Sequence, residues 1–373
     1  MRWMFWLSAG VLGYMYAGYG LWLWLRSFLR PRPIDRAPSL PSLSLVMVVR
    51  NEERYLEEKL RRLLELDYCA ERCQVVVVSD GSTDRTEAIL RDFAVHPRVC
   101  AILNALAAGK ASGVNDAMAW AQGELIVFTD ARQTIEPGAI RLLAENFADP
   151  AVGCASGELM LGSPDSGEAA QGMGLYWKIE KKIRELESAS GSVVGATGAL
   201  YAVRRELVPP LPPGMILDDV YIPMQVARQG FRVVFDGRAR AWDLPHQGRE
   251  REFGRKVRTL TGNYQLLQLA PWLLRRENPV RFEFVSHKLL RLLAPFALAA
   301  ALISSVFLAA PVYRAALVCQ ILFYLLATLG ITQRNHGPLT RMTDAAFTFV
   351  MLNTAALIAF ANFVTGRKQA WVR

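Results

Sequence analysis

Residues 45–84 read LVMVVRNEERYLEEKLRRLLELDYCAERCQVVVVSDGSTD, and this stretch decides the fold class. Two uncharged, valine-rich runs, Leu45–Val49 and Gln74–Val78, are typical of parallel strands that are buried on both faces. Between them, the leucines of Glu53–Leu66 recur at the spacing of one helical face. A strand, a helix and a second strand in this order predict an α/β fold with a mainly parallel sheet.

The alternation of strands and helices continues along the chain. Further buried strands are predicted at Glu124–Thr129 and Phe231–Phe235, and further helices at Arg85–Phe93 and Tyr221–Gln229. Either Thr83 or Asp84 can cap the helix that follows Gln74–Val78. Trp177–Glu187 has the pattern of a charged amphipathic helix, which we expect to be a solvated surface and not a site.

The composition excludes several classes of protein. The chain of 373 residues is 52% hydrophobic and 21% charged, which is too apolar for a disordered chain and unusual for a soluble enzyme. Its five cysteines have no regular spacing, so neither a disulfide framework nor a zinc site is expected, and free thiols fit the cytoplasm. The net charge of +9 comes without a nucleic-acid recognition motif, so no nucleic-acid partner is expected.

The excess of apolar residues lies in uncharged runs long enough to cross a bilayer, which takes about 20 residues. These runs are Trp3–Leu25, Leu292–Tyr313, Ala315–Gln333 and Ala345–Gly366. We therefore predict an N-terminal transmembrane anchor at residues 1–28 and about three transmembrane helices at residues 292–366, of which the first two form a hairpin. A cleaved signal peptide is the alternative for the first run, but that run is longer than a signal peptide's apolar core.

Basic residues near the ends of these runs predict the orientation of the chain. Arg26 and Arg30 follow the first run, and Lys288 and Arg291 precede the second. This pattern places the middle of the chain on the cytoplasmic side of the inner (plasma) membrane of the cell. Four spans would leave residues 367–373, with three cations, outside, so one apolar run is expected to be re-entrant or interfacial. Residues 266–291 mix tryptophan, leucine and arginine and are predicted to be an interfacial amphipathic segment.

Polar side chains follow three of the predicted strands. They are Arg50, Asn51, Glu52 and Glu53 after the first strand, Asp80 after the second, and Asp130 after Glu124–Thr129. In open parallel sheets, ligands bind in the crevice beyond the carboxyl ends of the strands. The placement of these clusters therefore predicts a ligand site at one edge of the sheet.

Six motifs in order resemble those of the membrane-integrated family 2 glycosyltransferases, which are relatives of the cellulose, hyaluronan and poly-N-acetylglucosamine synthases. The motifs are Val49–Glu53, Ser79–Asp84, Gly109–Ala111 with Asn115, Phe128–Asp130, Leu217–Asp219 and Arg255–Thr259. The resemblance covers about residues 43–265. It implies a GT-A-type nucleotide-diphospho-sugar transferase domain at residues 42–265, exposed to the cytoplasm.

The resemblance also implies a UDP-sugar donor and the residues that bind it. Asp80 has the position that contacts uracil in the family, and helix capping is the alternative reading of this residue. Asn51 and Glu52 would line the base and ribose pocket, or else form a plain strand-to-helix turn. The complete set of implied donor-binding residues is Arg50, Asn51, Glu52, Asp80, Ser82, Lys110, Asn115, Arg132, Arg255 and Arg258.

A divalent cation, Mg²⁺ or Mn²⁺, is expected on the donor diphosphate. Asp130 matches the first acid of the family's Asp-x-Asp motif, and carboxylate and phosphate oxygens are the ligands that hard cations prefer. Arg132 stands where the family has the second acid. Either this guanidinium contacts phosphate itself, or another acid completes the metal shell.

The acid pair Asp218 and Asp219 is the predicted catalytic centre. In the family, the second acid of such a pair is the general base, which by position is Asp219, with Asp218 supporting it. A general base removes the proton of the acceptor hydroxyl while its oxygen attacks the anomeric carbon and inverts the configuration. The alternative reading is an acid pair at the start of a helix.

These residues together predict a membrane-bound inverting glycosyltransferase that extends a polysaccharide or another glycan. Arg255 and Arg258 share a helix face and match the diphosphate-binding position of processive family members. Thr259 replaces the family's tryptophan, so the alternative is a single transfer to a polyprenyl phosphate or another lipid acceptor. Membrane lipid, a homodimer or an export partner are the expected partners. A non-catalytic scaffold and a transporter are the rival classes, and uncharged spans disfavour the transporter.

Overall fold

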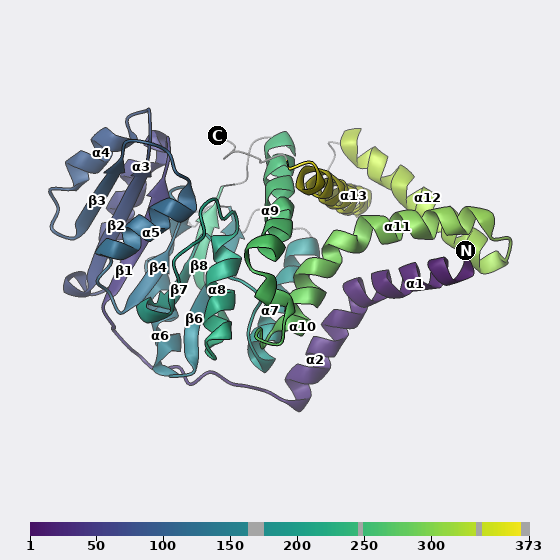
Figure 1. Cartoon of the computed structure of the whole chain (residues 1–373), viewed down its shortest axis with the longest axis horizontal. Coiled ribbons are helices and arrows are strands. Elements are labelled where there is room, and N and C mark those ends of the chain that lie inside the picture. Colours follow the sequence, from purple (N-terminus) through teal and green to yellow (C-terminus); the bar gives the residue numbers. More distant parts are fainter. Residues whose placement is uncertain (163–174, 245–248, 333–337, 367–373) are drawn as a thin grey trace.

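The computed structural model describes residues 1–162, 175–244, 249–332 and 338–366. These residues form an α/β domain and a group of long helices beside it (Figure 1). The strands are β1 (Leu43–Val49), β2 (Cys73–Asp80), β3 (Val99–Asn104), β4 (Leu125–Phe128), β5 (Thr134–Ile135), β6 (Val152–Leu161), β7 (Tyr201–Arg204) and β8 (Arg232–Asp243). The helices of the α/β domain are α3 (Glu53–Leu64), α4 (Thr86–Phe93), α5 (Lys110–Trp120), α6 (Ala139–Glu145), α7 (Leu175–Ser190), α8 (Asp218–Arg228) and α9 (Arg249–Leu269).

The remaining helices come from the two ends of the chain. They are α1 (Arg2–Gly13), a π-helical turn at Tyr14–Gly18, α2 (Tyr19–Leu29), α10 (Arg281–Phe284), a π-helical turn at Val285–Leu289, α11 (Leu290–Phe307), α12 (Pro311–Thr332) and α13 (Pro338–Val364). α1 lies alongside α11 (Figure 1), and its Phe5 also packs against Tyr313 of α12, with the two ring centroids 4.9 Å apart. The N-terminal helix is therefore packed against the C-terminal helices.

The strands of the described residues form a single sheet in the order β3-β2-β1-β4-β7-β6-β8-β5. β1 pairs in parallel with β2 and β4, and β2 pairs in parallel with β3. β7 is antiparallel to both of its neighbours, and β5 is antiparallel to β8. The sheet is thus mainly parallel, as predicted, and the carboxyl ends of β1, β2 and β4 lie together at one edge.

Helices cover both faces of this sheet. All seven residues of β1 are buried, because alternate side chains enter two different cores. Leu56, Leu60 and Leu63 of α3 pack into one core, as their helical spacing predicts. Val114 of α5 and Met224 of α8 pack into the other. Burial on both faces explains why the valine-rich strands could be recognised from sequence.

Two predicted elements differ from the structure. β8 continues to Asp243, well beyond Phe231–Phe235, because the polar residues from Asp236 onward remain paired with β6 across an irregularity at Ser156–Glu158. The prediction of a solvated helix at Trp177–Glu187 is wrong. The side chain of Glu187 in α7 is 0% exposed and that of Glu180 is 16% exposed. Both carboxylates face other helices, where charged partners compensate their burial.

Three helices in the described part of the chain are long and apolar enough to cross a membrane: Arg281–Phe307, Pro311–Gly330 and Met342–Val364. They agree with the predicted C-terminal group of about three. The N-terminal helix is not among them, so its role as an anchor stays a prediction. Residues 367–373, whose charges raised the question of a re-entrant segment, lie outside the described residues.

The segment at residues 266–291 packs partly against the α/β domain. Trp272 and Leu273 are 8% and 0% exposed and belong to the domain core. Leu274 and Phe282 are 44% and 47% exposed. Only the exposed apolar residues of this segment are available for the interfacial role that the sequence predicted.

Candidate active site

The loops after β1 and β2 are joined by hydrogen bonds. The Oδ1 atom of Asn51 accepts the N–H of Thr83 at 2.8 Å, and the N–H of Asn51 donates to Oγ of Ser82 at 3.2 Å. Asn51 has φ 55°, a left-handed conformation that asparagine adopts more readily than most residues. Asp84 caps the next helix, since its Oδ1 accepts the N–H of Thr86 at 2.9 Å. Hydrogen bonds within the chain therefore hold the loops after β1 and β2 together at this edge of the sheet.

Two further predicted donor-binding residues lie in these loops. Arg50 directly follows β1 and is half-buried. Glu52 is also half-buried, and its N–H donates to Oγ1 of Thr86 at 2.9 Å. Burial raises the pKa of Glu52, and the charge of Asp130 adds to this effect, while Arg132 opposes it. Glu52 therefore belongs to the same charged neighbourhood as Asp130 and Arg132.

Asp80 is fully buried at the end of β2 and holds the loop before α5. Its carboxylate accepts the backbone N–H of Ala108 at 2.7 Å and that of Gly109 at 3.0 Å. Gly81 is required beside it, because φ is +62° and an added Cβ would lie 2.5 Å from the nitrogen of Ala107. Asp80 thus fixes the start of α5, and its implied contact with uracil stays a prediction.

Lys110, the first residue of α5, lies at the centre of the site. Its Nζ atom is 3.1 Å from Oδ1 of Asp130 and 3.1 Å from Oδ2 of Asp218. Burial alone would lower the pKa of Lys110, but Asp130, Asp218 and Asp219 outweigh it and raise the pKa. The lysine is therefore a permanent cation that holds together acids from two separate segments, the loop after β4 and the start of α8.

Asp218 and Asp219 begin α8 and have different surroundings. Asp218 is 4% exposed and is paired with Lys110. Burial and the charge of Asp218 raise the pKa of Asp219 to about 6, although Lys110 opposes the shift. An added Cβ at Gly198 would lie 3.2 Å from Oδ2 of Asp219, so the glycine keeps this carboxylate accessible. A carboxylate with a pKa near neutrality suits a general base.

Arg132 and Arg255 meet at a residue that the sequence analysis missed, Asp243 at the end of β8. The Oδ1 atom of Asp243 is 3.4 Å from Nη2 of Arg132, and its Oδ2 atom is 3.9 Å from Nη1 of Arg255. Oδ2 also accepts a hydrogen bond from Nε2 of Gln133 at 3.2 Å. Arg258, one turn beyond Arg255 on α9, is half-buried. The sequence analysis did not predict a role for Asp243, because it predicted that this strand ends at Phe235.

Lys59 is a second residue that sequence reasoning missed. It is buried on α3, and its Nζ atom donates to Oγ1 of Thr129 at 2.9 Å and to the carbonyl oxygen of Gln133 at 2.7 Å. Burial lowers the pKa of Lys59 to about 7, with Asp130 opposing. The sequence does contain a signal for Lys59, because this lysine lies on the same helical face as the buried leucines of α3.

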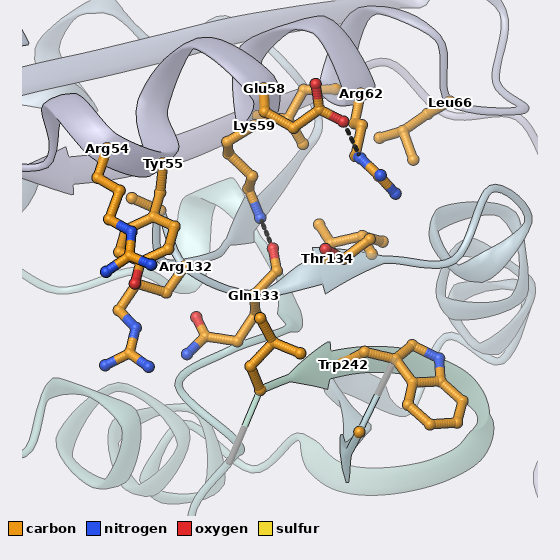
Figure 2. Close-up of a pocket in the computed structure, with 15 residues that line it drawn as sticks. Arg54, Tyr55, Glu58, Lys59, Arg62, Leu66, Arg132, Gln133, Thr134 and Trp242 are labelled. Carbon is orange, nitrogen blue, oxygen red and sulfur yellow. Dashed lines mark hydrogen bonds and ion pairs between the residues drawn. The ribbon is translucent and has the colours of Figure 1, made fainter. Parts of the chain in front are cut away.

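A cavity of about 270 Å³ lies between α3 and the loop after Asp130, beside Arg132. Figure 2 shows Arg54, Tyr55 and Arg132 gathered at one side of it and Trp242 below. Lys59 reaches across to Gln133 and ties α3 to this loop (Figure 2). The loop that carries Arg132 is thereby held in place by the helix that follows β1.

Asn115 of α5 binds the backbone of Leu211 with its side chain. Its Oδ1 accepts the N–H of Leu211 at 2.8 Å, and its Nδ2 donates to the carbonyl oxygen of Leu211 at 2.9 Å. Both polar atoms of the side chain hold the segment that leads to α8. The donor-binding role that the resemblance implies for Asn115 stays a prediction, and the geometry assigns it first to positioning that segment.

We expect Asn115→Ala to lower the stability of the protein by about 2 kcal/mol, because it leaves two backbone groups of Leu211 without partners. Thermal unfolding in detergent should show a fall in Tm of about 4 °C. Ser112→Ala on the same helix is the control and should leave Tm unchanged. An unchanged Tm combined with a raised KM for the donor would instead assign Asn115 to the donor.

The residues at the sheet edge fit a divalent cation held by a single carboxylate. Asp130 is 41% exposed, and only its Oδ1 is engaged by Lys110. Within the described ranges, no group of three or more His, Cys, Asp or Glu residues could hold a metal on its own. Mg²⁺ in nucleotide sites is commonly bound by one or two carboxylates together with substrate phosphates. A metal here would therefore depend on the donor diphosphate for most of its ligands.

Part of the chain, including the strand-end residues after β1, β2 and β4, matches a known protein family. The description "Glycosyl transferase family 2" matches residues 44–209. The chain is 31% identical over 116 residues to a beta-monoglucosyldiacylglycerol synthase of Synechocystis sp., which covers 30% of this chain and 24% of that protein. It is 21% identical over 247 residues to a poly-beta-1,6-N-acetyl-D-glucosamine synthase of Staphylococcus aureus, which covers 65% of this chain and 60% of that protein. The chain thus spans 24% of the length of the first relative and 60% of the length of the second.

One solved structure matches almost the whole chain. A mannosyltransferase of Pyrobaculum calidifontis, solved with GDP-mannose and Mn²⁺, has a TM-score of 0.75 and 22% sequence identity. The match covers 98% of this chain and 100% of that one, and it supports the GT-A-like fold. Residues 44–209 therefore match a glycosyl transferase family 2 domain, and the chain is similar to enzymes of that type.

Proposed function

We propose that the chain is a membrane-bound inverting glycosyltransferase that moves a sugar from a UDP-sugar to a hydroxyl group of a glycan acceptor. The observation that carries this proposal is the placement of Asp219 next to Asp218, whose carboxylate shares Lys110 with Asp130; burial and the charge of Asp218 also raise the pKa of Asp219 to about 6. This carboxylate lies beside the cluster of Lys110, Asp130 and Asp218 at the ligand-binding edge of the sheet. The membrane location is supported by the three apolar helices, with the α/β domain in the cytoplasm.

In the proposed reaction, Asp219 accepts the proton of the acceptor hydroxyl. The acceptor oxygen forms a bond to the anomeric carbon as the bond from that carbon to the diphosphate oxygen breaks, with inversion. Lys110 stabilises the negative charge that develops on the leaving diphosphate. Arg132 and Arg255, both oriented by Asp243, are placed to add charge-assisted hydrogen bonds to it.

A divalent cation, Mg²⁺ or Mn²⁺, would be held by Asp130, the carboxylate of the cluster with the greatest exposure. When bound, the ion would neutralise charge on the diphosphate. The relative with solved coordinates that was crystallised with Mn²⁺ supports this proposal through its shared fold.

Asp130→Asn is expected to raise the concentration of Mn²⁺ that gives half-maximal activity by at least about tenfold, because loss of even an indirect ligand contact weakens metal sites by that much. The measurement is release of nucleoside diphosphate against Mn²⁺ concentration. Asp67→Asn, at an exposed ion pair with Arg141, is the control. An unchanged Mn²⁺ requirement would remove Asp130 from the proposed metal site.

A hydroxyl acceptor is supported by the chemistry of the base. A hydroxyl needs a base during attack, whereas the oxygen of a phosphate acceptor is already anionic and would be repelled by Asp219. The names of both relatives describe products of sugar transfer, one a polymer of N-acetylglucosamine and the other a glucosylated diacylglycerol.

A single transfer to a lipid acceptor is the second candidate. Thr259 stands where processive members have tryptophan, and it is exposed on α9 with its Oγ1 donating to the carbonyl oxygen of Arg255 at 3.0 Å. The diacylglycerol-derived product of one relative supports an acceptor that is itself a lipid. Product length separates the two candidates.

The proposal is tested by incubating the full chain in lipid nanodiscs with UDP-sugars and GDP-sugars and with Mg²⁺ or Mn²⁺. We expect release of UDP from one donor, and release that is about 1,000-fold slower from the Asp219→Asn variant. Mass analysis of the product then distinguishes a polymer from a single addition. Release from GDP-mannose alone would overturn the UDP assignment, and no release with any donor and added glycan or lipid acceptors would contradict the proposal.

The activity should fall as the pH drops below about 6, because the pKa of Asp219 is raised to about 6 and only its ionised form accepts a proton. The measurement is kcat/KM between pH 4.5 and 8, with thermal unfolding at each pH to exclude loss of fold. A profile that is flat down to pH 5 would contradict the assignment of Asp219 as the base.

A further inference from the structure

Helix α7 carries three charged residues on one face, Glu180, Arg184 and Glu187, at the spacing of successive helical turns. The face lies between the membrane-type helices and the sheet. Burial alone would raise the pKa of Glu180 and of Glu187, but cationic neighbours outweigh it and hold both pKa values below the usual range. Both side chains are therefore carboxylates at neutral pH.

The first contact of this face is with the helix that begins at Arg281. His287 lies in the π-helical turn before α11, and its side chain is 1% exposed. Its Nδ1 atom is 2.8 Å from Oε1 of Glu187, and its Nε2 atom is 3.1 Å from Oε1 of Glu180. A carboxylate only accepts hydrogen bonds, so the ring satisfies both partners when both nitrogens carry protons. Arg291 adds a 2.8 Å contact to Oε2 of Glu180.

The N-terminal helix joins the same contact. The hydroxyl of Tyr19 donates to Oε1 of Glu187 at 2.6 Å. Arg26 is paired with Glu283 and also donates to the carbonyl oxygen of Ser190, the last residue of α7, at 3.0 Å. α7 is thus held by helices from both ends of the chain.

The second contact of α7 is with the loop at residues 194–198. Oε2 of Glu187 accepts the N–H of Val194 at 3.3 Å. The guanidinium of Arg184 donates from Nη1 to Oγ1 of Thr197 at 2.5 Å and from Nη2 to Oγ of Ser156 at 2.8 Å. Glu187 and Arg184 therefore tie this loop to the same helix face that holds His287.

This loop lies directly against Asp219. The N–H of Ala196 donates to the carbonyl oxygen of Asp219 at 2.6 Å. Gly195 has φ +96°, and an added Cβ there would lie 3.3 Å from the same oxygen. Gly198 lies against the carboxylate itself, where an added Cβ would be 3.2 Å from Oδ2. Displacement of the loop would therefore move the proposed base.

We infer that His287 is a positioning residue, which sets the location of Asp219 through Glu187, Arg184 and the loop at residues 194–198. The inference rests on the proposed function for Asp219, but the connection itself is a property of the fold. It makes the transfer rate depend on how the helix at Arg281–Phe307 is seated. A misplacement of about 1 Å at a reacting group costs on the order of 100-fold in rate.

Hydrogen–deuterium exchange of the full chain in nanodiscs tests the connection without any need for activity. We expect His287→Gln to speed exchange at the amides of Val194 and Ala196 by about tenfold, which corresponds to about 1.4 kcal/mol of lost protection. The amides of Ala108 and Gly109, which bind Asp80, should be unchanged. Ser286→Ala is the matched control, because Ser286 contacts Tyr14 at 2.8 Å and not α7.

A kinetic cycle then tests the effect on the base. His287→Gln and Thr197→Val should each lower kcat by about tenfold with KM for the donor within about twofold, because neither residue is among the proposed donor-binding residues. The double variant should lose about tenfold, and not about 100-fold, because both changes interrupt the same connection, whereas distant independent sites add. His96→Gln, outside this region, should have no effect.

Unchanged exchange at Val194 and Ala196 in His287→Gln would overturn the inference, whatever the fate of the proposed function. Additive losses in the kinetic cycle would also overturn it. Faster exchange in the loop in a protein with no transferase activity would keep the connection and reject the role of Asp219.

Discussion

Asp219→Asn is expected to lower kcat about 1,000-fold while KM for the donor changes by less than about threefold, because a positioned base contributes between about 100-fold and 10,000-fold. Asparagine preserves the shape of the side chain and the backbone contact with Ala196, but it accepts no proton. The variant also removes one of two neighbouring negative charges, so Tm should not fall. The measurement is nucleoside diphosphate release under saturating donor and acceptor.

The matched control is Asp92→Asn, on the exposed side of α4, which should retain full activity. The residual activity of Asp219→Asn should also lose the fall below about pH 6, since the titrating group is gone. A variant that keeps the wild-type rate would show that the proton leaves by another route. In that case a phosphate acceptor, which needs no base, becomes the better candidate.

Lys110→Met is expected to lower kcat about 100-fold, since one group that stabilises charge in the transition state contributes about this much. The lysine also opposes the rise in the pKa of Asp219, so its removal should move the acid limb of the pH profile to higher pH. Lys178→Met, at an exposed position of α7, is the control.

The two effects of Lys110→Met separate a catalytic role from a structural one. Loss of a purely structural cation would lower Tm and leave the pH profile of the remaining activity in place. A catalytic cation beside Asp219 changes the profile as well. A lower rate with an unshifted profile would contradict the electrostatic link between Lys110 and Asp219.

The sequence predicted the fold class and the clustering of polar residues at one edge of the sheet. The valine-rich strands β1 and β2 are buried on both faces, so their composition alone marks them. The leucines of α3 recur at helical spacing because one face of this helix packs into the core. The strand-end residues Asn51, Asp80 and Asp130 could be placed together because parallel strands end on the same side.

Other features of the site depend on residues that are far apart in the chain. Asp243 contacts Arg132 and Arg255, which come from a loop and from α9. The second half of β8, which leads to Asp243, pairs with β6 beyond an irregularity at Ser156–Glu158, so the position of Asp243 depends on a distant strand. No local pattern predicts such a contact.

The environment of the charged residues on α7 depends most clearly on the tertiary structure. Glu180 and Glu187 stand in a segment whose charge pattern is typical of a solvated helix. They are buried because His287, Arg291 and Tyr19 lie opposite them. A carboxylate can leave water when a charged partner replaces its solvation, and the partner here is about a hundred residues away. The sequence by itself predicted the acids and cations that follow the strands, but neither Asp243 nor Lys59. The tertiary structure decided which charges meet, because compensation of a buried charge depends on its neighbours in space.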